Sequence, residues 1–186
     1  MNKKELKEII KEEKDIYIPS KYLYQKYTRA KLYMIWKLLS NYRKAQYYRE
    51  TLKNTKGISR IINSLKFRFF TRKKNIYSEK CGIEIANERK IGRRLRLWHG
   101  GVVINANLGD DCAVHGNNIL GNKGEMSPNG VPNIGNNVDV GGGAIVIGEL
   151  TIADNCCIGA NAVVTKSFTV PGSVIVGIPG RLLEKG

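Results

Sequence analysis

The sequence predicts an α+β protein in which an α-helical region precedes a parallel β-helix of hexapeptide repeats. Aliphatic residues recur at an unbroken period of six, at Ile134, Val140, Val146, Ile152, Ile158 and Val164. Four residues after each of them stands a second, mostly small or aliphatic set, namely Val138, Ala144, Leu150, Cys156, Ala162 and Phe168. Neither an α-helix nor a single strand has this period, whereas stacked coils that bury one apolar column do. A glycine-rich loop with accidental spacing is the alternative interpretation.

The six-residue step also organises the chain before residue 134. Ile85, Ile91, Leu97 and Val103 keep it, and Leu108, Val114 and Leu120 resume it after a slip of one residue. The step then fails across residues 121–133, GNKGEMSPNGVPN, which are rich in Gly, Pro and Asn. We expect this segment to be a loop that projects from the coils, and such loops often shape a functional site. The predicted β-helix domain spans residues 79–186.

Residues 1–78 are predicted to form a basic, α-helical N-terminal domain. Residues 1–96 carry 27 Lys and Arg against 9 Asp and Glu, whereas residues 97–186 carry 4 against 7. Apolar spacing predicts helices over residues 2–14, 21–53 and 58–70, with Ser20 as a possible cap of the second. We expect the apolar stripe of residues 58–70 to pack against the rest of this domain. Contact with an anionic membrane is the alternative, and the absence of a recognised motif argues against nucleic acid.

The cysteines and the N-terminal sequence indicate the cellular compartment in which the protein is expected. The four cysteines show no C-x-x-C spacing, so we expect buried thiols at Cys112 and Cys156 and neither a metal site nor a disulfide framework. The N-terminus has no apolar signal region, and no run of 18 apolar residues occurs. These features predict a cytoplasmic protein, with peripheral attachment to the inner face of the membrane as a further hypothesis.

Two histidines, His99 and His115, lie within the coiled region, and His99 is the candidate general base. Gly100 and Gly101 follow His99 and would leave room for a ligand. Glu84 precedes His99 by 15 residues, close to one coil of three hexapeptides, so its carboxylate could orient the imidazole. A solvent-facing histidine without a role is the alternative. We expect His99, Glu84 and the loop to share one site.

The segments GIEI, KIGRRLRLWHGGVVIN, PNIGNNVDVGGGAIVIGELTIADNCCIGANAVVTKSF and VIVGIPGRLL resemble the serine acetyltransferase group of left-handed β-helix acyltransferases. The resemblance runs from about residue 80 to the C-terminus. The helices before it resemble the leader of serine-acetyltransferase-like proteins found with polysaccharide biosynthesis genes. The resemblance to the serine acetyltransferase group implies a homotrimer that transfers acetyl from acetyl-CoA to a hydroxyl, without a metal.

The resemblance also implies roles for individual residues. The residue matched by His99 deprotonates the acceptor hydroxyl, and Glu84 stands where the family carries an aspartate. Candidate acetyl-CoA contacts carried over by position are Gly121, Gly142 and Ala160, with Lys166 and Arg181 for the CoA phosphates.

Departures from the family bear on the acceptor. Serine acetyltransferases carry an acidic residue where this chain has Trp98, and an Arg-His pair where it reads Gly130-Val131. Because free serine is a zwitterion, we expect a sugar or polysaccharide hydroxyl instead, with Trp98 stacking on the ring and His115 in a secondary binding role. Serine O-acetylation in cysteine synthesis and a non-enzymatic basic scaffold are the alternatives.

Overall fold

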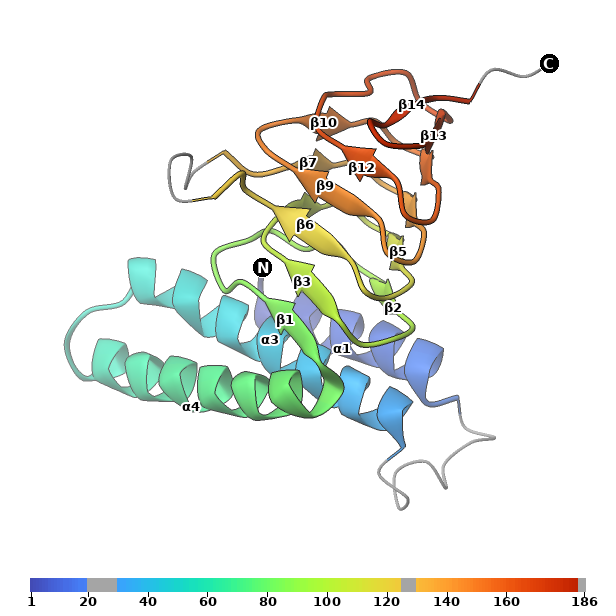
Figure 1. The fold of residues 1–186 in the computed structure, drawn as a ribbon. Helices are drawn as coiled ribbons and strands as arrows, with labels where there is room; N and C mark the ends of the chain where they lie inside the picture. The colour runs from blue at the N-terminus through green and yellow to red at the C-terminus, as the bar shows by residue number, and fades with distance from the viewer. Residues whose placement is uncertain (20–29, 125–129, 184–186) are drawn as a thin grey trace. The chain divides into compact units, whose positions relative to one another are not determined.

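The computed structural model describes residues 1–19, 30–124 and 130–183. The chain divides into two compact units, Met1–Cys81 and Gly82–Gly186. The first unit is helical and the second is the β-helix (Figure 1). The predicted cap Ser20 and the first part of the helix predicted over residues 21–53 lie outside the described residues. None of the helices within the described ranges has the length and hydropathy that crossing a bilayer requires.

The helical unit begins with α1 (Lys3–Tyr17), which starts at a capping box. The Asn2 side chain accepts hydrogen bonds from the backbone N–H groups of Lys4 and Glu5, both at 2.9 Å, and the Glu5 side chain accepts one from the Asn2 N–H. This arrangement satisfies donors that every helix N-terminus leaves open. The helix buries one stripe, consisting of Leu6, Ile9, Glu13 and Tyr17.

The central helix of the unit is α3 (Lys31–Lys53), which packs against both α1 and α4 (Gly57–Cys81). Its fully buried apolar side chains are Ile35, Leu38, Leu39 and Tyr42. Ile35, Leu39 and Tyr42 therefore belong to the core of the helical unit.

Helix α4 differs from the prediction in its length and in the face it buries. It continues to Cys81, well past the predicted end at residue 70, and buries only Lys74 and Cys81. The predicted packing of its apolar stripe is wrong, because Ile58, Leu65 and Phe69 are 76 %, 62 % and 51 % exposed. The physical reason is that α1 packs on α3, so no described element of the helical unit covers the far face of α4.

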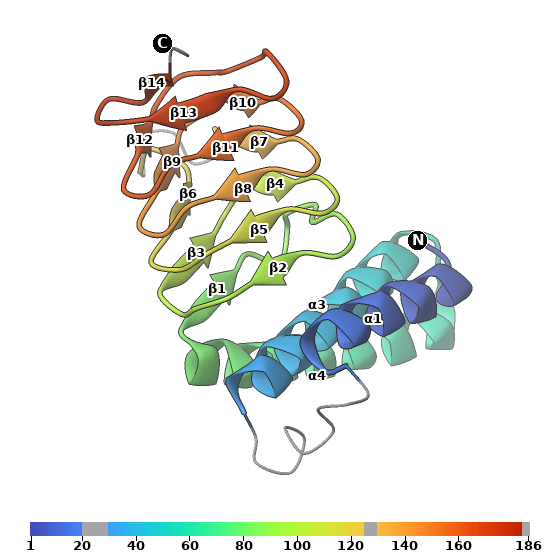
Figure 2. The same cartoon turned by 90° about the vertical axis from the view of Figure 1, so that its right-hand side faces the viewer.

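The second unit is a left-handed parallel β-helix with three sheets. Sheet A consists of β1 (Ile83–Ile85), β3 (Val102–Ile104), β6 (Ile119–Gly121), β9 (Ile145–Ile147) and β12 (Val163–Val164). Sheet B consists of β4 (Asn107–Leu108), β7 (Asn133–Ile134) and β10 (Thr151–Ile152). Sheet C consists of β2 (Arg96–Leu97), β5 (Ala113–Val114), β8 (Asp139–Val140), β11 (Cys157–Ile158), β13 (Val174–Val176) and β14 (Arg181–Leu182). The chain visits sheets A, B and C in turn as it climbs (Figure 2), and among the strands of the described residues only β14 runs antiparallel to its neighbour.

The predicted apolar column is confirmed. Ile134 pairs with Ile152, Val140 with Ile158, and Val146 with Val164, so each coil there is three hexapeptides long. All six of these side chains are at most 4 % exposed. The second set of small and aliphatic residues, which includes Cys156, is buried as well. Cys112 is likewise buried, as predicted.

The coils before residue 134 depart from a uniform length. Val103 was expected to point inward, but it is 37 % exposed, and its neighbours Val102 and Ile104 are buried instead. An extra residue in the turn before β3 shifts the strand by one position, which moves each side chain to the opposite face. The loop between β6 and β7 lengthens its coil, so that Val114 pairs with Val140, further along the chain than a regular coil would place it.

The corners of the β-helix require left-handed backbone conformations, and asparagine supplies them as often as glycine. Between sheets C and A the φ angles of Gly101, Asn117, Gly143 and Asn161 are 73°, 55°, 73° and 57°. Asparagine tolerates this region better than other residues with a Cβ.

Candidate active site

We call the turns that join sheet C to sheet A the C–A corner. His99 lies in the first of these turns, between β2 and β3, and it is exposed. Gly101, at φ 73°, donates its N–H to the Gly82 carbonyl at 2.6 Å and so anchors the turn to the coil below. In the coil above, a Cβ at Gly116 would lie only 2.6 Å from the His99 Cβ. Glycine at position 116 thus leaves His99 the space it occupies, whereas a Cβ at Gly101 would meet Asn117 instead.

Glu84 lies one coil below His99, on the outward face of sheet A. It is exposed in the middle of β1, and it pairs in register with Val103, four residues beyond His99. No hydrogen bond joins Glu84 to His99, although both belong to the described part of the chain. The structure therefore places Glu84 in the adjacent coil, without the direct contact that would fix the imidazole tautomer.

Trp98 and His115 occupy equivalent positions of neighbouring coils on the outward face of sheet C. Leu97 pairs with Val114, and the backbone N–H of Trp98 donates to the Val114 carbonyl at 3.2 Å. His115 therefore follows directly above Trp98. Trp98 is 39 % exposed. Strands in a sheet lie about 4.8 Å apart, so these two residues start from neighbouring backbone positions on the same outward face.

Asp139 joins this surface, although sequence analysis did not single it out. Its Oδ1 lies 2.7 Å from Nε2 of His115, and the two side chains are 53 % and 43 % exposed. They stand 24 positions apart with the loop between them, so a fixed period could not reveal the pairing. The register of β5 with β8 could have revealed it, because Ala113 pairs with Asp139.

The candidate acetyl-CoA residues separate onto two corners. Gly142 and Ala160 lie on the C–A corner, in successive coils above His99, where Asn161 donates its N–H to the Gly142 carbonyl at 2.9 Å. Gly121 ends β6 at the turn from sheet A to sheet B, which we call the A–B corner, and its carbonyl accepts from the Gly148 N–H. The loop also leaves from the A–B corner. Within one chain, the structure does not bring Gly121 to His99, and loop residues 125–129 lie outside the described residues.

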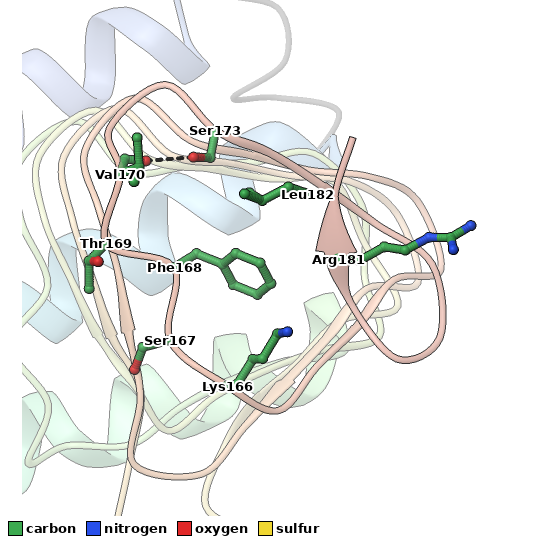
Figure 3. Close-up of a pocket in the computed structure, with 8 residues that line it drawn as sticks. All are labelled: Lys166, Ser167, Phe168, Thr169, Val170, Ser173, Arg181 and Leu182. Carbon is green, nitrogen blue, oxygen red and sulfur yellow. Dashed lines mark hydrogen bonds between the residues drawn. The ribbon is translucent and has the colours of Figure 1, made fainter. Parts of the chain in front are cut away.

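Lys166 and Arg181 line one pocket of about 490 Å³ at the C-terminal end of the coils (Figure 3). Lys166 follows β12, and its Nζ lies 5.6 Å from the centre of the Phe168 ring. The Arg181 side chain extends away from that ring (Figure 3). Both cations also border the adjoining turn that contains Gly177 and Pro179. Two cations at one exposed pocket suit a phosphate-bearing ligand.

At the place of the family's Arg-His pair, the structure offers neither a cation nor an imidazole. Gly130 and Val131 are both buried, with Val131 6 % exposed. Two arginines of this unit are already engaged elsewhere. Arg94 forms an ion pair with Asp111, and Arg96 donates to the Asp111 carbonyl at 2.8 Å.

The cysteines of the β-helix are unlike activated nucleophiles. Burial raises the pKa of the Cys112 thiol to about 11, and burial also raises the pKa of the exposed Cys157. A thiol with a raised pKa is a poor nucleophile near neutral pH. Among residues 1–19, 30–124 and 130–183, no group of His, Cys, Asp and Glu is arranged to hold a metal ion.

Comparison with known proteins identifies relatives that match most of this chain. The serine acetyltransferase of Staphylococcus xylosus is 40 % identical over 132 residues, which cover 69 % of this chain and 55 % of that protein. That of Staphylococcus aureus strain N315 is 36 % identical over 162 residues, which cover 85 % and 67 %. The structure of soybean serine acetyltransferase, solved as the apoenzyme, superposes with a TM-score of 0.64 at 25 % identity and covers 81 % and 58 %. No family model matches the chain.

These relatives are longer than this chain, and the match covers little more than half of the S. xylosus protein. The match to the S. aureus protein reaches into the helical unit as well as the coils. Together with the left-handed hexapeptide coils and the WHGG turn, it shows that the chain belongs to the serine acetyltransferase family of hexapeptide-repeat acyltransferases.

Proposed function

We propose that the protein is an acetyl-CoA-dependent O-acetyltransferase that uses His99 as its general base. The observation that carries the proposal is the exposed His99 in the C–A corner, beside Gly116, where a Cβ would lie only 2.6 Å from the His99 Cβ. In the proposed reaction the imidazole takes the proton of the acceptor hydroxyl as its oxygen attacks the thioester carbonyl. The C–S bond then breaks, an O-acetyl ester forms, and the proton passes to the leaving CoA thiolate.

We propose L-serine as the first acceptor to test, because the relatives are named serine acetyltransferases. This preference replaces the expectation of a sugar or polysaccharide acceptor, which rested on Trp98 and on the Gly130-Val131 segment alone. Polysaccharide biosynthesis has no support among these relatives.

A saccharide hydroxyl remains the second candidate because of one specific surface. Trp98, His115 and Asp139 together present an aromatic face and hydrogen-bonding groups, which suit the C–H face and the hydroxyls of a sugar ring. Asp139→Asn keeps the shape of this surface but removes its charge. If the surface binds the acceptor, this variant raises KM for the acceptor at least severalfold and leaves KM for acetyl-CoA unchanged. If Asp139→Asn has the same KM values as the wild type for both the acceptor and acetyl-CoA, the surface has no role in binding.

We also propose a homotrimer in which the site is completed by a neighbouring copy. The candidate acetyl-CoA residues lie on two different corners of one chain, so a cleft between copies is required to unite them. Glu84 would then act by orienting His99 when the acceptor is bound, since catalytic hydrogen bonds often tighten only in the complex. Sedimentation of a single species with the mass of one chain would contradict this assembly.

The acceptor is tested by measuring thiol release from acetyl-CoA, corrected for hydrolysis, with L-serine and separately with a panel of sugars. Release with L-serine supports the first proposal, and release with a sugar alone moves the acceptor to the second candidate. Lack of release in every reaction, together with no acetyl-CoA binding, would favour the non-enzymatic scaffold. His115→Ala is expected to retain part of the activity, whereas His99→Ala loses it.

A further inference from the structure

The helical unit carries an aromatic pocket that the proposed reaction does not use. The pocket measures about 440 Å³ and is lined by Tyr48 of α3 and by Leu65, Lys66, Phe69 and Phe70 of α4. The Tyr48 and Phe70 rings are stacked with centres 5.7 Å apart, and Phe69 meets Phe70 edge to face at 5.2 Å. These rings form a pre-arranged apolar floor on the outside of the unit.

Three lysines surround this floor. The Nζ atoms of Lys66, Lys44 and Lys73 lie 5.4, 5.3 and 4.7 Å from the ring centres of Tyr48, Phe70 and Phe69. Burial, followed by the charges of Lys37 and Lys73, lowers the pKa of Lys44. Among the described residues, no Asp or Glu forms an ion pair with any of the three. The surface therefore carries positive charge that an anionic ligand would neutralise.

An exposed aliphatic stripe continues from the pocket toward the start of α4. It consists of Ile58, Ile61, Ile62 and Leu65, which are 76 %, 62 %, 45 % and 62 % exposed. Their spacing of three, one and three residues places them on one face of the helix. We call the stripe together with the pocket and its lysines the α4 face. Contiguous exposed apolar surface of this kind marks an interaction site.

The charge of α4 decides between possible occupants of the α4 face. Of its residues, seven are Lys or Arg and one, Glu79, is acidic. The same face of a second copy would bring like charges together and be repelled. A helix with Ile, Leu and Phe on one side and Lys and Arg beside them suits the interface of a lipid bilayer. Each basic residue near an anionic bilayer contributes about 1 kcal/mol to binding.

We infer that the α4 face docks on the surface of an anionic lipid bilayer, independently of the proposed reaction. The apolar stripe and the aromatic floor enter the region between headgroups and acyl chains. Lys44, Lys66 and Lys73 contact lipid phosphates from the rim of the pocket.

The test is co-sedimentation of the full chain with vesicles of phosphatidylcholine alone and of phosphatidylcholine mixed with phosphatidylglycerol. We expect at least tenfold tighter binding to the anionic vesicles, and weaker binding as salt is raised above about 0.15 M. Lys66→Glu/Lys73→Glu should lose most of this binding. The matched control, Lys7→Glu/Lys90→Glu, makes the same change in net charge on exposed lysines outside the α4 face and should retain more of it.

A second variant separates the lipid from other occupants. Leu65→Ser/Phe69→Ser removes apolar contacts from exposed positions and should weaken vesicle binding at least tenfold at unchanged charge. The inference is overturned if both vesicle types bind equally, or if the two lysine variants behave alike. It is also overturned if no vesicles bind while Leu65→Ser/Phe69→Ser lowers the mass of the assembly in sedimentation, because a second copy would then cover the face.

Discussion

The buried ion pair between Glu13 of α1 and Arg43 of α3 gives the sharpest prediction about stability. The two side chains are 0 % and 2 % exposed, and Glu13 Oε1 accepts from Arg43 Nη2 at 2.6 Å and from Nε at 3.0 Å. Burial raises the pKa of Glu13, and the Arg43 charge opposes that rise. Removing one partner leaves the other charge buried without its counterion, which costs about 3–5 kcal/mol.

The expected loss is large relative to what a unit of this size can supply. At about 0.05–0.15 kcal/mol per residue, the helical unit is stable by only about 4–12 kcal/mol. Glu13→Leu should therefore lower the urea midpoint of the helical transition by about 1–5 M, given a slope of about 1–3 kcal/mol per M. The control Glu8→Gln changes an exposed carboxylate of the same helix and should stay within about 0.5 kcal/mol of the wild type.

The assay is urea unfolding followed by circular dichroism for both single variants and for Glu13→Leu/Arg43→Met. Since the double variant leaves no buried unpaired charge, it should recover much of the loss, with a coupling energy of about 2 kcal/mol or more. In Arg43→Met the remaining Glu13 lacks its cation, so its pKa rises further. The folded state then binds the proton more tightly than the unfolded state, and stability falls as the pH rises above the ordinary value of 4.5. Additive losses without coupling would refute the reasoning.

Two predictions concern the β-helix. Gly116→Ala should lower kcat about 100-fold in the acetyl-CoA assay, because its Cβ would displace His99. The control Gly172→Ala is also at positive φ but has open space around it, and it should keep its activity. Equal losses of activity in the two variants would mean that backbone strain alone is responsible. Because the folded state keeps the Cys112 proton up to about pH 11 while an unfolded thiol loses it near 9.0, this residue adds stability below pH 9 that is lost between pH 9 and 11, by about 3 kcal/mol at most. The free energy of unfolding of Cys112→Ala should therefore fall less between pH 9 and 11 than that of the wild type. An identical pH dependence of stability in the two proteins would contradict a raised pKa of Cys112.

The hexapeptide coils could be predicted from sequence because a single local rule repeats along them. One aliphatic residue per six points inward at each side of the coil, so Ile134 and its successors specify both the strands and their stacking. The rule failed at Val103, where one extra residue in the turn beside His99 shifts the strand. A period read from sequence cannot locate such an insertion when both neighbouring residues are also aliphatic.

The arrangement of the candidate site depends on long-range register, and this explains what sequence reasoning missed. Asp139 meets His115 only because the coil containing the loop returns to pair β8 with β5. Gly121 lies on another corner than Gly142 because it ends a sheet A strand, whereas Gly142 follows a sheet C strand. The exposed stripe of α4 was mistaken for core because helical periodicity identifies an apolar face but does not reveal what covers it.

The role of His99 as the base for acetyl transfer to a hydroxyl can be tested by following product formation. The measurement follows, by mass spectrometry, the formation of the O-acetyl product from acetyl-CoA and L-serine, with wild-type protein and with His99→Asn, whose acetyl-CoA binding is measured in parallel. The wild type should form product in step with free CoA, while His99→Asn should be slower by about 100-fold or more and bind acetyl-CoA as before. Wild-type rates in His99→Asn, with L-serine or with any other acceptor that the wild type acetylates, would contradict the account.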